Sequence, residues 1–216
     1  MSVTIHTSNA PAVEQTLIAA WREVPVSVAV DLVPECQIDP SLQAQSLHDR
    51  RIRMAGPALT VSCTPPDFGA VVRALDEACA GQVVVIDAGA LTSHAVIGEI
   101  LGGHLRAKGC AGLVVYGAVR DITDLGSWDD FPVFALSVNP LGPTSATDGS
   151  INSAVSVGGV SIQPGDLVLG DRDGLAVLTP QSAQDRLADA QAKLALEAQW
   201  IEGLANGKSA KEVFGL

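Results

Sequence analysis

The chain has 216 residues, 47% of them hydrophobic and 17% charged, a composition typical of a globular protein with a large core rather than of a disordered one. With 13 Lys+Arg against 24 Asp+Glu the net charge is −11, which argues against binding to the phosphates of a nucleic acid. The length favours one domain over residues 1–216.

No apolar run approaches the ~18 residues needed to cross a bilayer, so we expect no membrane partner. Residues 1–9 contain no basic stretch followed by an apolar run, which predicts a cytoplasmic location. The four cysteines form no Cys-x-x-Cys pair, and we expect reduced, mostly buried thiols.

In the first half of the chain, apolar residues at helical spacing predict a helix over residues 12–23. Residues 24–31 carry alternating valines after Pro25 and are expected to form a short strand. A β-rich run follows at 54–63, and the prolines and aspartate at 65–67 separate it from a helix around 71–78. The β-branched run 83–86 predicts a buried strand.

In the second half, residues 98–108 are expected to form a helix and residues 112–116 a buried strand, so this strand-helix-strand order predicts a partly parallel sheet in an α/β fold. Further strands are predicted at 131–136, 154–157, 167–169 and 175–178. The last element is an amphipathic helix over about 180–205, with Thr179 as its cap and Pro180 in its first turn.

Residues 98–121 carry the main chemical signal, because a strand-helix-strand connection can bring a glycine-led helix start beside Arg120 and Asp121. A helix start offers unpaired N–H groups to an anion, and arginine adds a planar fork for the same anion. Asp121 supplies a hard oxygen suited to Mg²⁺ or Mn²⁺. The pattern indicates a site for a metal-chelating oxoacid, and an ordinary surface ion pair remains the alternative on spacing alone.

The same stretch, with MAGPALTV at 54–61, FPVFA at 131–135 and PGDLVLGDRDGLAVL at 164–178, resembles the RraA-like family. That family includes metal-dependent 4-hydroxy-4-methyl-2-oxoglutarate/4-carboxy-4-hydroxy-2-oxoadipate aldolases and the regulator of ribonuclease E activity A. The resemblance implies a layered α/β sandwich of the swivelling β/β/α type. It also implies assembly as a homotrimer or a dimer of trimers.

For the site, the resemblance implies that Arg120 binds the substrate and that Asp121 ligates a divalent cation, Mg²⁺ or Mn²⁺. It places the pyruvyl carboxylate on the backbone of Gly98, Glu99, Ile100 and Leu101. Glu99 is also implied to organise a water at the metal.

A further acid comes from the last helix, where Glu197 interrupts the apolar stripe. The resemblance implies a glutamate from a neighbouring subunit near the metal, acting through water, and Glu197 is the candidate. A glutamate that reaches solvent from the edge of the stripe is the alternative.

The implied activity is a metal-dependent (class II) pyruvate aldolase that cleaves a 4-hydroxy-2-oxoacid, with oxaloacetate decarboxylation as a side activity. No lysine lies in a setting that predicts burial, which disfavours a Schiff-base aldolase. The alternative is a non-catalytic, protein-binding regulator, but the regulators look like relatives without the metal-binding aspartate that Asp121 provides here.

Substrate identity stays open, and a lyase acting on another hydroxy-oxoacid is a third possibility. The family's usual Pro-Gly-Asp-Asn turn reads Pro66-Asp67-Phe68-Gly69 in this chain, which bears on substrate preference. The other candidates are assigned structural roles: packing for His94 and His104, a core position for Cys110, and a turn for the Asp171–Gly174 stretch.

Overall fold

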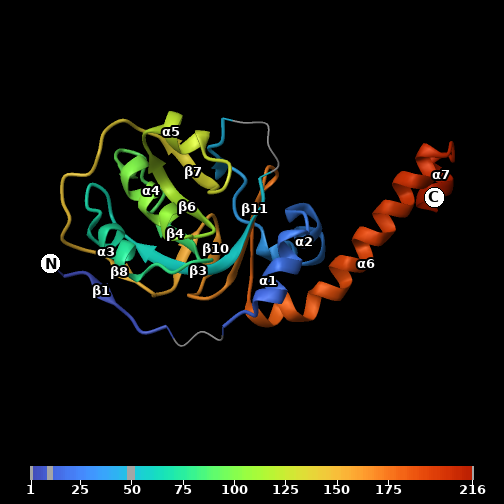
Figure 1. Cartoon of the computed structure of the whole chain (residues 1–216), viewed down its shortest axis with the longest axis horizontal. Coiled ribbons are helices and arrows are strands. Elements are labelled where there is room, and N and C mark those ends of the chain that lie inside the picture. The colour runs from blue at the N-terminus through green and yellow to red at the C-terminus, as the bar shows by residue number, and fades with distance from the viewer. Residues whose placement is uncertain (1, 9–11, 48–51, 216) are drawn as a thin grey trace.

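The computed structural model describes residues 2–8, 12–47 and 52–215, and its centre is a mixed β-sheet (Figure 1). The strands are β1 (Thr4–Ile5), β2 (Gln43–Ala44), β3 (Met54–Ser62), β4 (Val83–Asp87), β5 (Ala95–Ile97), β6 (Gly112–Val119), β7 (Val133–Val138), β8 (Ser150–Ile151), β9 (Val155–Val157), β10 (Val160–Ile162), β11 (Leu167–Asp171) and β12 (Gly174–Leu178). The helices are α1 (Gln15–Arg22), α2 (Val26–Leu32), a 3₁₀ turn η1 (Pro34–Cys36), α3 (Gly69–Glu77), α4 (Glu99–Ala107), α5 (Ile122–Ser127), α6 (Pro180–Ala205) and α7 (Ala210–Phe214).

The middle of the sheet is parallel, as the strand-helix-strand order predicts, because β3, β4, β6 and β7 all pair in the same direction. Strand β4 is buried on both faces, and its alternate side chains point into different layers. Val84 and Ile86 pack in the cluster beneath helices α3, α4 and α5. Val83 and Val85 pack in a second cluster with β9 to β12. The predicted β/β/α layering is thereby confirmed.

Strand β3 joins the two β layers. Its first residues pair antiparallel with β11, whereas its last five pair parallel with β4. A third apolar cluster forms where α1, α2 and α6 pack on β11 and β12. Trp21 is fully buried there, and its Nε1 donates to the carbonyl of Ala183 (2.9 Å). The start of α6 is thus tied to the body of the molecule.

Helix α6 has the predicted bounds, and Thr179 caps it by accepting a hydrogen bond from the N–H of Ser182. Beyond the contact with α1 and α2 the helix extends away from the sheet, and α7 folds back on its end (Figure 1). Among the helices of the described ranges, none combines the length and the apolar character needed to cross a bilayer.

The prediction of a strand over residues 24–31 is wrong, because residues 26–32 form helix α2. Pro25 occupies the N-cap, and the N–H of Val26 donates to Oδ2 of Asp171 (2.9 Å), a partner 145 residues away. Val26, Val28 and Ala29 are buried in the third cluster. Tertiary burial and a distant cap therefore override the β-propensity of the valines.

The cysteines are all free, and Cys36, Cys63 and Cys110 are buried. Burial, with the nearby carboxylates of Asp87 and Asp67, raises the pKa of the Cys63 thiol to about 12. These residues act as small core side chains, as predicted for Cys110.

Candidate active site

Two adjacent strand ends form the candidate site. Strand β5 ends at Ile97 and leads into α4, while β6 ends at Val119 and leads into Arg120 and Asp121. The N–H of Arg120 donates to the carbonyl of Ile97 (3.1 Å), which holds the two strand ends side by side. The predicted meeting of the α4 start with Arg120 and Asp121 is confirmed.

Asp121 faces the start of α4 because its backbone turns sharply at that point. It has a left-handed conformation with φ +58°, which is uncommon for a residue other than glycine. Its Oδ2 accepts a hydrogen bond from the N–H of Glu99 (3.1 Å) and lies 3.6 Å from Nε of Arg120. The side chains of Arg120 and Asp121 are each 41% exposed, so both remain accessible to a ligand.

Gly98 is the residue that lets these groups come together. A Cβ atom added to it would lie 2.8 Å from Cγ of Arg120 and would overlap Oδ2 of Asp121. The backbone of Gly98 is extended (φ −146°), so the requirement for glycine comes from space and not from its dihedral angles. The glycine at the start of α4 is therefore needed for close approach of the carboxylate.

Arg120 is held on its other side by the loop that contains Gly142. A Cβ atom added to Gly142 would lie 3.2 Å from Cζ of Arg120 and would overlap Nη1. The guanidinium thus lies against bare backbone, which restricts its position without an acidic partner from that loop.

These groups border an open cavity of about 240 Å³, and most of the site residues expected from the sequence line it. It is lined by Phe68, Ala95, Val96, Ile97, Gly98, Ile100, Leu101, Arg120, Asp121 and Pro143. Glu99 is exposed and lies outside this lining set, although its N–H holds Asp121. The structure therefore brings Gly98, Ile100, Leu101, Arg120 and Asp121 together and leaves the Glu99 side chain at the margin.

The start of α4 has donors available for an anion at this cavity. The first hydrogen bond within the helix runs from the N–H of Gly102 to the carbonyl of Gly98 (2.9 Å). The N–H groups of Ile100 and Leu101 precede that bond and so have no acceptor inside the helix. Together with the partial positive charge of a helix start, they favour a carboxylate beside Arg120.

Asp67 joins the loops that carry Phe68 and Pro143, two of the residues that line the cavity. It accepts hydrogen bonds from the N–H groups of Gly69 (2.8 Å), Thr147 (2.9 Å) and Asp148 (3.1 Å), and from the hydroxyl groups of Thr147 (2.8 Å) and Ser145. Burial acts to raise the pKa of Asp67, but the hydrogen bonds from Ser145 and the backbone outweigh it and hold the pKa well below its usual range. The loop of Phe68 is thereby joined to the loop of Pro143.

The carboxylate of Asp121 is the kind of hard oxygen ligand that Mg²⁺ and Mn²⁺ prefer, and it would be a single protein ligand. Among the described residues no group of three His, Cys, Asp or Glu side chains could hold an ion. Mg²⁺ is commonly bound through one or two carboxylates and keeps several waters, and Mn²⁺ prefers similar ligands. With Oδ2 of Asp121 engaged by the N–H of Glu99, Oδ1 of the same carboxylate can serve as the single protein ligand.

Glu197 lies on α6, on the other side of the molecule from α4 (Figure 1). Its Oε1 is 3.9 Å from Nζ of Lys193, which also binds Asp31 (2.7 Å). Within one chain the structure does not bring Glu197 to Asp121. His94 and His104 are also absent from the cavity lining. His94 is half-buried, whereas His104 is exposed on α4, so the packing role predicted for His104 is wrong.

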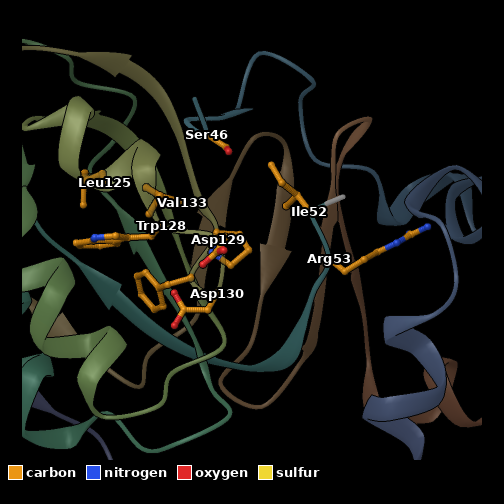
Figure 2. A pocket seen from close by; sticks show the side chains of 10 residues that line it. Ser46, Ile52, Arg53, Leu125, Trp128, Asp129, Asp130 and Val133 are labelled. Carbon is orange, nitrogen blue, oxygen red and sulfur yellow. The ribbon is translucent and has the colours of Figure 1, made fainter. Parts of the chain in front are cut away.

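A second cavity, of about 140 Å³, lies beside the start of β7 (Figure 2). Arg53 borders it but points away, because its Nη1 binds Oδ2 of Asp171 (3.0 Å). Trp128 stacks with the guanidinium of Arg106 (5.2 Å), which in turn pairs with Asp130 (2.6 Å). None of the predicted site residues lines this smaller cavity, so we take the larger cavity beside Arg120 and Asp121 as the candidate active site.

Sequence reasoning missed Gly142 and Pro143 as site residues, and it treated Phe68 only as a departure from a family turn. Pro140, Gly142 and Pro143 are typical turn residues, but no local pattern links a turn to a side chain some twenty residues earlier. Asp67 gave no signal beyond its place in the 66–69 turn and in the proline-rich break.

A family model described as RraA-like, Aldolase/RraA, matches residues 29–177. A protein of Halalkalibacterium halodurans named "Putative 4-hydroxy-4-methyl-2-oxoglutarate aldolase" is 38% identical over 183 residues, 84% of this chain and 85% of that protein. The solved structure of the RNA-processing inhibitor RraA from Thermus thermophilis is 32% identical with a TM-score of 0.65, covering 73% of this chain and 93% of the other. An uncharacterized protein of Pseudomonas syringae pv. tomato shares the fold, with a TM-score of 0.81 at 23% identity over 94% of this chain and 98% of the other.

Proposed function

Because the chain belongs to the RraA-like (Aldolase/RraA) family, we propose that it is a divalent-metal-dependent lyase that cleaves a 4-hydroxy-2-oxoacid by retro-aldol reaction and releases pyruvate. The observation that carries the proposal is the convergence of Arg120, Asp121 and the start of α4 on one cavity. The aldolase name of the relative at 38% identity supports it.

In this proposal the substrate carboxylate binds between the guanidinium of Arg120 and the N–H groups of Ile100 and Leu101. The two N–H groups are held in place by the helix, and Arg120 packs against Gly142. Donors that need no reorganisation stabilise negative charge as it develops during cleavage.

Asp121 would hold Mg²⁺ or Mn²⁺, and the cation would supply a Lewis acid for the reaction. Glu99, exposed at the margin of the cavity, would orient a water that carries a proton between the C4 hydroxyl and solvent. The same donors, Arg120 and the N–H groups of Ile100 and Leu101, would stabilise the negative charge that develops when oxaloacetate loses carbon dioxide.

The proposal includes assembly as a homotrimer or a dimer of trimers, with Glu197 of one copy reaching the cavity of the next through water. The extension of α6 beyond the body supports this part (Figure 1). A cytoplasmic location completes the proposal and is supported by the four free cysteines.

The test is pyruvate release from 4-hydroxy-4-methyl-2-oxoglutarate and from oxaloacetate, with Mg²⁺ or Mn²⁺ and with chelator. Asp121→Ala should abolish metal-dependent release. Asp124→Ala removes the same charge from an exposed position three residues later and serves as the matched control. Equal loss in both variants, or activity that persists in chelator, would refute the assignment of the metal to Asp121.

A second candidate is a non-catalytic, protein-binding regulator, and the 32% identity to the RNA-processing inhibitor RraA favours it. Its test is RNA cleavage by ribonuclease E with and without the purified chain. Inhibition by a folded chain that releases no pyruvate from any 4-hydroxy-2-oxoacid would move the function to this class.

A further inference from the structure

Asn139 follows strand β7 and binds two other segments of the chain near the candidate site. Its N–H donates to the carbonyl of Val119, the last residue of β6 (3.0 Å). Its Nδ2 donates to the carbonyls of Thr92 (2.7 Å) and Ser93 (3.1 Å), which lie 47 and 46 residues away along the chain. Asn139 therefore ties the loop after β7 to the end of β6 and to the segment that leads into β5.

The same side chain shapes the turn that follows it. Oδ1 of Asn139 accepts a hydrogen bond from the N–H of Leu141 (2.9 Å), the local bond by which asparagine stabilises a turn. The carbonyl of Leu141 accepts in turn from the N–H of Ala95 (2.8 Å), the first residue of β5 and a lining residue of the cavity. The backbone is thus held on both sides of Leu141, directly before Gly142.

The position of Gly142 matters because the guanidinium of Arg120 lies against it. A methyl group added to Gly142 would overlap Nη1 of Arg120 and would lie 3.2 Å from Cζ. On the other side, Nε of Arg120 is 3.6 Å from Oδ2 of Asp121, and the side chain is 41% exposed. A long side chain has many rotamers and keeps one position only where its surroundings restrict it. A shift of the turn that carries Gly142 would therefore release the guanidinium.

A turn alone does not account for an asparagine at this position. Aspartate or serine could accept the hydrogen bond from the N–H of Leu141, since both commonly stabilise turns. Neither carries an amide, whose one oxygen accepts and whose two protons donate. The amide of Asn139 uses both properties, because it shapes the turn and anchors it to the carbonyls of Thr92 and Ser93.

We propose that Asn139 is a positioning residue of this site: by fixing the turn that carries Gly142, it holds the guanidinium of Arg120 where the substrate carboxylate binds. The side chain of Asn139 does not line the cavity, so its effect on the reaction passes through Arg120. The consequence for catalysis rests on the proposed lyase function, whereas the mechanical relation between the two residues does not.

The kinetic test compares Asn139→Ala with Thr144→Ala, which removes an exposed side chain from the same loop. Arg120 binds a carboxylate that is present in the substrate and in the transition state alike. Loosening it should raise KM for pyruvate release from 4-hydroxy-4-methyl-2-oxoglutarate by about tenfold and leave kcat within about threefold. Thr144→Ala should keep both constants. An unchanged KM in Asn139→Ala would overturn the inference.

A double variant shows whether the effect passes through Arg120. In Arg120→Lys the cation is a compact ammonium on a flexible stem, which does not depend on the surface at Gly142. Adding Asn139→Ala to this variant should raise KM by less than about twofold, because two changes that act through one contact are not additive. A further rise of about tenfold would place the action of Asn139 elsewhere and would overturn the inference.

Chemical modification separates failure of the inference from failure of the function. Phenylglyoxal reacts with accessible guanidinium groups, and peptide mass spectrometry gives the rate at each arginine. We expect Arg120 to react at least about threefold faster in Asn139→Ala, because local opening exposes it. Arg106, which pairs with Asp130 and stacks on Trp128, should react at an unchanged rate and controls for general destabilisation.

An unchanged rate at Arg120, or an equal increase at Arg106, would overturn the inference whatever the kinetics show. If the unaltered protein releases no pyruvate, the lyase function fails and the modification rates alone decide the inference. Should Asn139→Ala not fold, Asn139→Ser gives the same test, because it keeps an acceptor for the N–H of Leu141 and loses the amide donors.

Discussion

Replacing Gly98 by alanine should lower the activity while the protein still folds. The added methyl group would lie 2.8 Å from Cγ of Arg120 and would overlap Oδ2 of Asp121. Restoring ordinary van der Waals separation requires the carboxylate to retreat by about 1 Å. Because a misplacement of that size can lower a rate by about 10²-fold, we expect a loss of about 10²-fold in kcat/KM, equivalent to ~2.7 kcal/mol.

The fold should survive this substitution because both displaced side chains are partly exposed and can turn toward solvent. Gly103→Ala is the matched control in the same helix, since its added methyl group would lie 3.8 Å from the ring of Trp128, an ordinary contact. Pyruvate release coupled to lactate dehydrogenase gives the rate, and thermal denaturation gives the stability. We expect Gly103→Ala to keep full activity and to gain up to about 1 kcal/mol of stability from helix propensity.

A folded Gly98→Ala protein with unchanged kcat/KM would refute the reasoning, because the carboxylate and the guanidinium would then not need the space that glycine leaves. Equal loss of activity in Gly103→Ala would refute it as well, since the effect would belong to the helix rather than to the contact with Asp121.

Three further predictions concern other parts of the molecule. Arg120→Lys should lower kcat/KM by about 10–150-fold, mainly through a higher KM, because an ammonium cannot reproduce the two-pronged guanidinium contact worth about 1.5–3 kcal/mol; steady-state kinetics checks this. Asp67→Ala should destabilise the protein by about 1–2 kcal/mol at pH 7, discounted for solvent exposure, as measured by urea denaturation. The folded-state pKa of Asp67 lies below the unfolded value of ~3.9, so the contribution of Asp67 to the free energy of unfolding is complete above that pH and is lost as the pH falls further. The difference in stability between the variant and the parent should therefore shrink in acid. Asp171→Ala should cost about 3 kcal/mol, since it leaves the half-buried Arg53 unpaired and removes the acceptor for the N–H of Val26; a loss below 1 kcal/mol in urea denaturation would contradict it.

The parts of the fold that the sequence predicted correctly depend on short-range patterns. The long last helix was predicted with its exact bounds because Thr179, Pro180 and a regular apolar spacing act within a few residues of one another. The central parallel strands β4 and β6 were predicted because each carries a run of β-branched residues that is buried on both faces. The short helix at 26–32 was mistaken for a strand because the acceptor for its first N–H, the carboxylate of Asp171, comes from 145 residues away.

For the site, the sequence by itself determined the chemistry of the polar end: a helix start with free donors, one guanidinium and one carboxylate, joined by a strand-helix-strand unit whose geometry is nearly fixed. Only the tertiary structure decided what surrounds them. The contact of Gly142 with Arg120, the bonding of Asp67 to the 145–148 loop and the apolar wall that includes Phe68 all link residues about twenty to eighty positions apart. Such contacts leave no periodic trace in the sequence, because they depend on how loops from different strands meet at one edge of the sheet.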